Sequence, residues 1–574
     1  MRITIKKPLA KLINISELAQ FGVDKDELTY RDQISINLAE TTLEKTENLR
    51  TILQKVKDKK KTVTILKDIQ TWVDIRQQKS TPIRKLEIFN IALISYLMHV
   101  EGHRIYTKFH LDDDLWLPYR VTSVRYSPPS QMNPAEVKMS VVYTCFGEDA
   151  YTTIDFYSKD VMGKKVPEIL AEKGIYIETP EFREKYLKTH KRFLEVFPNI
   201  GKQYIANGYG TDQVLDSLDY DFHRSRYTAT KFQFEDNKIV VDVFREKTDK
   251  DEYTREREVD KGELFWRNPL KNTMKSEYEE ITEEEEIKGD IEITKEDVIE
   301  VPTHPFLTVF DLQRHLRLRV HVNYVKEYKY DKTLSEKLIL NKDNKDLIQI
   351  LIEHKEGGFK DIVQNKTGGA IILLTGKAGV GKTLTAEVFA ESKEKPLYSV
   401  QSSQLGIETK HLEENLMKIL TRTARWNAIL LIDEADVYVH TRGNNINQNA
   451  IVGVILRILE YHSSVLFMTT NRPDVVDDAI ASRCVARIDY KYPDKDQQKQ
   501  IWRILADSSN IKLSDEIINQ FVEKNNDYSG RDIKNLLKLS NLRAKANQRD
   551  ITVEDIEFIT KFNPTVQEPD GEKQ

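Results

Sequence analysis

A short glycine-rich stretch, Gly376-Lys-Ala-Gly-Val-Gly-Lys-Thr383, has the residue types and spacing of a phosphate-binding loop. It follows an apolar run of strand type, Ile371 to Leu374, and precedes a helix-like segment. Glycines allow positive φ and a close approach of backbone N–H groups to phosphate oxygens, and the helix start adds a positive dipole end. Lys382 is placed to reach the β- and γ-phosphates, and the Thr383 hydroxyl to bind Mg²⁺. The alternative is a glycine-rich turn before an ordinary helix.

The stretch therefore predicts an ATP site whose contacts come from the loop and the first helical turn. The residues predicted to bind ATP there are Gly376, Lys377, Ala378, Gly379, Val380, Gly381, Lys382, Thr383 and Leu384.

Acidic side chains follow a second apolar run, Ala428-Ile-Leu-Leu-Ile-Asp-Glu-Ala-Asp436. A continuous apolar run is typical of a parallel strand that is buried on both faces, and its carboxyl end is where such sheets bind ligands. Asp433 is predicted to hold Mg²⁺ through its water shell. Glu434 is predicted to polarise an attacking water, a role worth about 10²–10⁴ in rate.

A third apolar run, Val465 to Thr470, ends in Asn471. The Asn471 amide is placed to orient the water or to sense the γ-phosphate. The alternative is a turn residue that ends a strand.

Composition describes a globular chain with room for several cores. The 574 residues are 39% hydrophobic and 31% charged, a length that corresponds to about three or four domains. A net charge of -5 gives no general reason to expect nucleic-acid binding. The only cysteines, Cys145 and Cys484, lack metal-site spacing, so we expect a reducing compartment and no structural zinc.

The chain offers no sequence signal for a membrane. The start, Met1-Arg-Ile-Thr-Ile-Lys-Lys7, has no apolar core of a secretory signal behind it. The most apolar window, Ile88 to Val100, is too short to span a bilayer. We therefore expect a cytoplasmic protein with no membrane partner.

The front half changes its hydrophobic period along the chain. Apolar residues three and four apart predict a mainly helical region over 1–103, and alternation with a period of two predicts paired strands within a mixed α/β domain over 104–270. Residues 271–300 include the run Glu283 to Glu286 and predict an acidic, solvated linker. In the segment 301–345, Leu316 to Val322 alternates apolar and basic residues, as a half-exposed strand would.

Taken together, four stretches resemble the AAA+ ATPase module. They are residues 376–383, residues 429–436, Thr470-Asn-Arg-Pro473 and Asp478-Ala-Ile-Ala-Ser-Arg483. The chain from about Phe306 to Pro564 also resembles a fungal-type AAA subgroup with an uncharacterised N-terminal domain, through Phe310-Asp-Leu-Gln-Arg-His-Leu-Arg-Leu-Arg-Val-His-Val322 and Leu456-Arg-Ile-Leu-Glu-Tyr461.

This resemblance implies an α/β fold. It places a P-loop AAA+ core over 346–492, with a parallel five-stranded sheet in the order 5-1-4-3-2. The strands are expected near Ile371, Leu397, Ile429, Val465 and Val485. A helical lid over 493–562 and a disordered tail over 563–574 would follow, and a mixed α/β N-terminal region would precede the core.

The resemblance also implies roles for residues outside the loop. Asn471 would be the sensor 1 residue. Arg483 would be an arginine finger that reaches the γ-phosphate of a neighbouring subunit, a contribution of about 10³–10⁵ in rate, with Arg487 as the alternative. Arg531 would be a sensor 2 contact, and Asp361 and Ile362 would hold adenine.

One departure from the family concerns the central pore. Unfoldases of this family carry an aromatic residue on the loop after the second strand, whereas Ser403-Gln-Leu-Gly-Ile-Glu-Thr-Lys410 has Leu405 and Ile407 but no aromatic residue. The second pore-loop segment, Arg442 to Asn449, is polar and rich in asparagine. Threading of a polypeptide is therefore not predicted.

These observations predict a Mg²⁺-dependent ATPase that forms a homo-oligomer, as a ring of six, and remodels a macromolecule, a protein rather than a nucleic acid. The alternative is a switch or scaffold whose assembly depends on ATP and whose hydrolysis is slow. A third hypothesis is a nucleic-acid motor that uses Arg314, Arg317 and Arg319.

Overall fold

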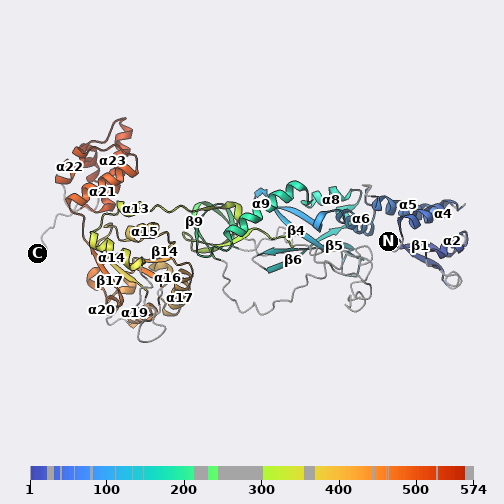
Figure 1. The fold of residues 1–574 in the computed structure, drawn as a ribbon, viewed down its shortest axis with the longest axis horizontal. Coiled ribbons are helices and arrows are strands. Elements are labelled where there is room, and N and C mark those ends of the chain that lie inside the picture. The colour runs from blue at the N-terminus through green and yellow to red at the C-terminus, as the bar shows by residue number, and fades with distance from the viewer. Residues whose placement is uncertain are drawn as a thin grey trace.

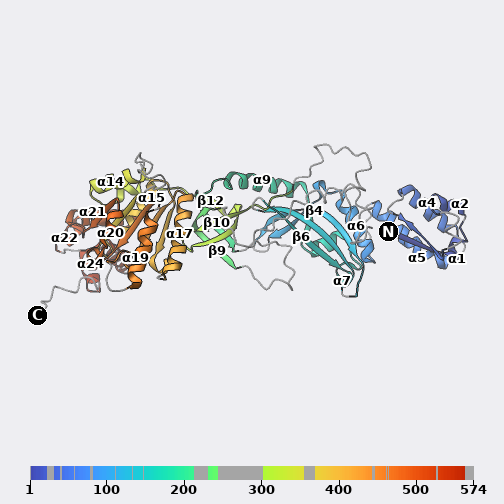
Figure 2. The ribbon, with the colours of Figure 1, turned by 90° about the horizontal axis from the view of Figure 1, so that it is seen from below.

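The computed structural model describes an elongated molecule whose parts follow one another along its length (Figures 1 and 2). The described residues are 2–562 without 14, 22, 24–30, 39–41, 57–58, 78–81, 110–111, 132, 146–147, 213–229, 243–300, 354–368, 407, 442–445, 461, 463 and 525–527. The whole of the predicted acidic linker, 271–300, and the predicted tail, 563–574, therefore lie outside the described residues. Among the described helices, none combines the length and the apolar character that crossing a bilayer requires.

The predicted core contains a parallel sheet of five strands in the order β14-β15-β16-β13-β17. Since β13 is first in sequence and β17 fifth, this is the predicted order 5-1-4-3-2. Side chains alternate between two faces: α17 and α19 cover one, and α14 and α15 the other. The elements are α14 Lys342–Glu353, β13 Ile371–Gly376, α15 Lys382–Ser392, β14 Leu397–Gln401, α16 Ser402–Leu405, α17 Thr409–Arg425, β15 Ile429–Asp433, α18 Asp436–Val439, α19 Ile446–Leu459, β16 Val465–Thr470, α20 Asp478–Arg483 and β17 Ala486–Tyr490.

A helical lid follows the core, as predicted. Its helices are α21 Lys495–Ser508, α22 Asp515–Lys524, α23 Gly530–Ala546 and α24 Val553–Thr560. They enclose a hydrophobic core of their own around the buried rings of Trp502, Phe521 and Tyr528. Each of α21 and α23 begins with a side chain that accepts a hydrogen bond from the first turn, Asp494 and Ser529, which satisfies an otherwise unpaired N–H group.

A small antiparallel sheet precedes the core. Its order is β11-β10-β9-β8-β12, and β11 also pairs with β8, so four strands close on themselves. The strands are β8 Gln203–Thr211, β9 Lys231–Val241, β10 Phe306–Asp311, β11 Leu316–His321 and β12 Val325–Glu327. We call this sheet the small barrel. It unites strands that the sequence division assigned to two segments, 104–270 and 301–345.

Farther from the core lies a larger antiparallel sheet in the order β6-β5-β4-β3-β7. Its strands are β3 Arg104–Phe109, β4 Asp112–Ser127, β5 Glu136–Cys145, β6 Glu148–Tyr157 and β7 Ile175–Ile177. The apolar window that was too short for a membrane span forms α6 (Leu86–Leu97), which is buried against this sheet. Helix α9 (Pro180–Val196) runs from the sheet to the small barrel (Figure 2).

The first residues combine helices with one short sheet. Strand β1 (Arg2–Lys6) pairs with β2 (Gln33–Asn37), beside α4 (Leu43–Gln54) and α5 (Lys59–Arg76). The region expected to be mainly helical thus also contains a strand pair. The remaining helices are the short α1 Lys7–Ala10, α2 Ile15–Ala19, α7 Ser158–Val161, α8 Val166–Glu172 and α13 Leu334–Lys337.

Candidate active site

The glycine-rich stretch joins the end of β13 to the start of α15, as a phosphate-binding loop requires. Gly376 has φ of 139°, and a Cβ atom there would lie 2.4 Å from the Tyr490 backbone oxygen. A side chain at Gly376 is therefore excluded by space as well as by backbone conformation. The N–H groups of the first turn of α15 point out of the helix at this loop and are available to an anion.

Lys382 and Asn471 meet at the loop although they follow different strands. The Lys382 ammonium donates to the backbone oxygens of Gly376 and Lys377, both at 2.7 Å, and to Asn471 Oδ1 at 2.9 Å. Burial lowers the pKa of Lys382, while the charges of Asp433 and Asp436 act in the opposite direction. The cation and the amide predicted to contact the γ-phosphate are thus adjacent.

The two predicted Mg²⁺ ligands also face each other. The Thr383 hydroxyl donates to Asp433 Oδ1 at 3.0 Å, and the Thr469 hydroxyl donates to the same carboxylate. Mg²⁺ prefers oxygen ligands and usually binds one or two protein groups together with substrate phosphates and water. A hydroxyl and a carboxylate at the end of a phosphate loop fit that preference.

Glu434 has a left-handed backbone, with φ of 53°. This conformation is unusual for a residue other than glycine and is often found at functional sites. It is held by β16: the N–H of Glu434 donates to Thr469 Oγ1 at 3.0 Å, and the N–H of Ala435 donates to the Thr469 backbone oxygen at 2.8 Å. The residue is exposed, so its carboxylate is accessible to water.

Asp436 is a site residue to which the sequence analysis gave no role. Its carboxylate accepts hydrogen bonds from the Thr470 hydroxyl and, at 3.0 Å, from the N–H of Asn471. It therefore fixes the end of β16 from which the Asn471 side chain extends. The position at the start of α18, just after an acidic strand end, was visible in the sequence, but the partners on β16 were not.

The lid contacts the phosphate loop through the start of α23. The N–H of Arg531 donates to the Gly379 backbone oxygen at 3.3 Å. The Arg531 charge also contributes to the lowered pKa of Lys382. This proximity supports the predicted contact of Arg531 with the nucleotide, which remains a prediction.

The two arginines considered as the finger are held by acidic residues of their own chain. Arg483, at the end of α20, donates to Glu460 Oε1 at 2.5 Å, and Arg487 of β17 donates to Asp489 Oδ1 at 3.1 Å. The finger role of either residue concerns a neighbouring copy and stays a prediction. Asp361 and Ile362, predicted to hold adenine, lie outside the described residues.

Comparison with known proteins agrees with this geometry. Residues 372–492 match the family model described as "ATPase family associated with various cellular activities (AAA)". A putative 26S proteasome regulatory subunit homolog of Methanothermobacter thermautotrophicus is 29% identical over 212 residues, 34% of this chain and 56% of that protein. Human fidgetin-like protein 1 is 28% identical over 199 residues, 33% of this chain and 29% of that protein.

A third relative is the katanin p60 ATPase-containing subunit A1 of Strongylocentrotus purpuratus, which is 27% identical over 208 residues, 33% of this chain and 40% of that protein. The chain spans about half the length of the first curated relatives it matches. Among solved structures, a chain of the HORMA:CdnC:Trip13 complex of E. coli MS115-1 is 16% identical, with a TM-score of 0.33, and the match covers 40% of this chain and 91% of that one.

Proposed function

Because residues 372–492 form an AAA ATPase family domain, we propose that this chain is a Mg²⁺-dependent ATPase that assembles with copies of itself and remodels a protein partner. The observation that carries the proposal is that four side chains from the ends of β13, β15 and β16 meet at one place. Lys382 donates a hydrogen bond to Asn471, and Thr383 donates one to Asp433. Each pair joins a residue of the phosphate loop to a residue at the carboxyl end of another strand of the same sheet.

The chemistry follows from the roles of these side chains. Lys382 binds the β- and γ-phosphate oxygens, Asn471 orients the attacking water, and Glu434 accepts its proton. Thr383 and Asp433 would hold Mg²⁺, which neutralises charge on the phosphates when bound. Hydrolysis transfers the γ-phosphoryl group of ATP to water and yields ADP and phosphate.

The finer part of the proposal concerns assembly. We place the chain in the fungal-type AAA subgroup and assign to it a ring of six copies in which Arg483 serves the neighbouring site. Support comes from the surface next to Arg483, where Val485 is 59% exposed. An exposed apolar side chain beside a half-exposed arginine suits a contact between subunits.

A switch or scaffold with slow hydrolysis is the second candidate function. Leu405, one of the apolar residues of the first pore-loop segment, is fully buried and is not available to grip a polypeptide. Ile407 lies outside the described residues. A nucleic-acid motor has less support, because Arg314 and Arg317 form ion pairs with Asp311 and Asp242.

Measurement of ATP turnover in variants tests the assigned chemistry. We expect Glu434→Gln to lower ATP turnover by about 10²–10⁴ while ATP binding persists, and Arg483→Ala to lower it by about 10³–10⁵. Arg487→Ala tests the alternative finger, because a comparable loss in that variant would assign the role to Arg487. Wild-type turnover in Glu434→Gln or in Arg483→Ala would contradict the assigned chemistry.

Mass measurement with and without ATP tests self-assembly. Stimulation of turnover by the partner captured on a Glu434→Gln variant would support remodelling. Slow, unstimulated turnover with an ATP-dependent change in mass would support the switch.

A further inference from the structure

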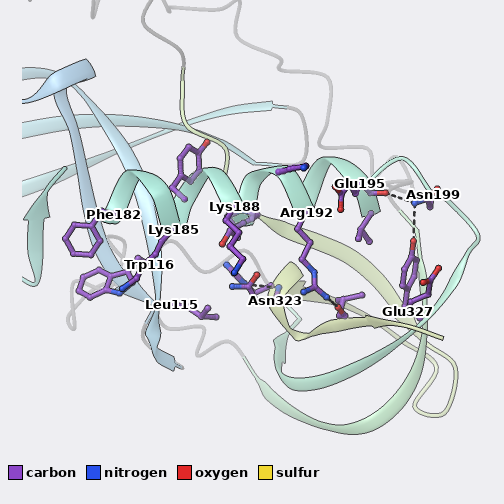
Figure 3. A pocket seen from close by; sticks show the side chains of 18 of the residues that line it. Leu115, Trp116, Phe182, Lys185, Lys188, Arg192, Glu195, Asn199, Asn323 and Glu327 are labelled. Atoms are coloured by element: carbon purple, nitrogen blue, oxygen red, sulfur yellow. Dashed lines mark hydrogen bonds between the residues drawn. The ribbon is translucent and has the colours of Figure 1, made fainter. Parts of the chain in front are cut away.

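A large open pocket lies far from the ATP site, between α9, the larger antiparallel sheet and the small barrel (Figure 3). Its volume is about 800 Å³, which lies within the usual range of ligand sites. One wall is α9, and the others come from β3, β4, the start of β8 and the strand β12. We call it the α9 pocket.

Cationic side chains of α9 line the pocket. Lys185, Lys188 and Arg192 are three or four residues apart and share one face of the helix, and Lys191 follows Lys188 by three residues and also lines the pocket. Lys188 and Lys191 have no ion-pair partner in the part of the chain that the structure describes, and both are exposed. Among the described residues, Lys185 forms an ion pair only with Glu181 of the same helix, and because both side chains are largely exposed this pair holds Lys185 weakly. The pocket therefore attracts negative charge.

One end of the pocket is aromatic. Trp116 of β4 and Phe182 of α9 have ring centroids 4.7 Å apart, and Phe182 stacks on Tyr106 at 5.1 Å. Figure 3 shows Trp116 and Phe182 beside Lys185, with Lys188 and Arg192 extending from the same helix toward the barrel. An occupant thus meets an aromatic wall and ammonium groups within one pocket.

The other end carries acidic groups. Glu195 and Glu327 line it, and Glu327 accepts from the Lys202 ammonium at 2.8 Å. A long polyanion that continued along the pocket would meet these carboxylates. The charge pattern therefore suits a short anionic segment that has an apolar or aromatic group at one end.

We propose that the α9 pocket binds an acidic peptide segment of a partner protein, in which aspartate or glutamate side chains flank an apolar or aromatic residue. The carboxylates pair with Lys188 and Lys191, and the apolar residue packs on Trp116 and Phe182. This inference rests on the proposed function, in which the front half selects a protein partner. It adds the chemical class of the segment and the place where it binds.

Binding is tested on the full chain without nucleotide, by fluorescence anisotropy of a labelled peptide of aspartate and glutamate with a central phenylalanine. We expect Lys188→Glu/Lys191→Glu to weaken binding of this probe about tenfold or more, because two attractive charges become repulsive. The matched control is Lys55→Glu/Lys67→Glu, which makes the same charge change at two exposed positions, one directly after α4 and one in α5. Equal binding by the two double variants, or no binding by wild type, would overturn the proposal.

The aromatic end is tested with a second probe in which alanine replaces phenylalanine. Trp116→Ala should weaken the phenylalanine probe and leave the alanine probe unchanged. An equal loss for both probes would mean that Trp116 only supports the fold of the pocket, and would overturn its assigned role.

Two other occupants are separated by the same assay. If an oligothymidine bound more tightly than the acidic peptide, and Lys188→Glu/Lys191→Glu weakened that binding, the pocket would be assigned to nucleic acid. Probe binding that occurs only after Glu283–Glu286 are replaced by serine would assign it to the chain's own acidic segment. Either result overturns the partner proposal, and because no ATP is present, both are distinct from a failure of the ATPase chemistry.

Discussion

The hydroxyl group of Thr469 forms hydrogen bonds with two residues of the candidate site, Asp433 and Glu434. The hydroxyl donates to Asp433, a predicted Mg²⁺ ligand, and accepts from the N–H of Glu434, whose backbone is left-handed. A strained backbone persists only where neighbours hold it. Thr469 is therefore placed to position both the predicted metal ligand and the predicted general base.

Removal of this hydroxyl should slow ATP hydrolysis without creating a cavity in the core. In Thr469→Val the shape is kept, and we expect turnover to fall about 10- to 100-fold, as for other groups that orient metal ligands. The Mg²⁺ concentration for half-maximal rate should rise as well, because Asp433 loses a hydrogen-bond donor. Titration of Mg²⁺ in the turnover assay measures both effects.

Thr423→Val is the matched control, since Thr423 is also fully buried but donates only to backbone oxygens of its own helix. Unchanged turnover and Mg²⁺ dependence in Thr469→Val would contradict the positioning role.

The site residues that the sequence analysis predicted from residue type and spacing lie within contiguous motifs. The phosphate loop, Asp433 and Glu434 each follow an apolar strand, and the chemistry needs them there. Asp436 and Thr469 were not predicted as site residues, because their role depends on which side chain of the next strand they face. Arg483 poses a further problem, since its predicted target belongs to another copy of the chain.

At the scale of elements, the lid and the phosphate loop meet at one glycine. Gly379 has φ of 80°, and a Cβ atom there would lie 2.7 Å from Ser529 Oγ and 2.9 Å from Arg531 Cβ. The start of α23 can approach the loop this closely only because Gly379 has no side chain. The position of the lid is thus linked to the loop that is predicted to bind phosphate.

Gly379→Ala should therefore displace the lid even without nucleotide. We expect faster hydrogen exchange of the backbone amides in the first turns of α23, because the Arg531 N–H loses its bond to Gly379 and the added methyl group pushes Ser529 away. Hydrogen exchange followed by mass spectrometry measures this.

The matched control is Gly381→Ala. Gly381 also has a positive φ, 102°, but a Cβ atom there would contact nothing within 4 Å. The control introduces similar backbone strain without touching the lid, so equal exchange of α23 in the two variants would contradict the lid contact.

Helices and strands were predicted best where the hydrophobic period of the sequence and the family resemblance agreed. The order of the parallel sheet and the lid followed from the resemblance, and the strand positions agree with the apolar runs. The sequence division placed the strands of the small barrel in two segments, because a long, acidic stretch separates β9 and β10 in sequence although they pair. Hydrophobic period identifies a strand but not its distant partner.

At the scale of the whole molecule, the small barrel and the ATPase core meet at a packed junction around Trp426. Phe310 of β10 packs on Trp426, which follows α17, with ring centroids 5.1 Å apart. The Gly201 backbone approaches Trp426 so closely that a Cβ atom would lie 2.8 Å from its Cα atom. Asp242 is fully buried there and pairs with Arg317 of the barrel and Arg425 of the core.

This junction should be the main determinant of rigidity between the two parts. Asp242→Ala leaves Arg317 and Arg425 without their shared carboxylate. Removal of one partner of a buried ion pair costs about 3–5 kcal/mol, so we expect the free energy of unfolding to fall by about that amount. Urea unfolding and limited proteolysis between barrel and core measure the loss.

Glu327→Ala provides the comparison that assigns this loss to burial. Glu327 pairs with Lys202 at 2.8 Å, but the two side chains are 67% and 46% exposed, and such surface pairs contribute little to stability. Because Asp242 pairs with Arg425 of α17 as well as with Arg317 of the barrel, Asp242→Ala should also open the barrel to protease while the ATPase core stays protected. Equal destabilisation by the two substitutions would mean that the carboxylate of Asp242 does not hold the barrel on the core.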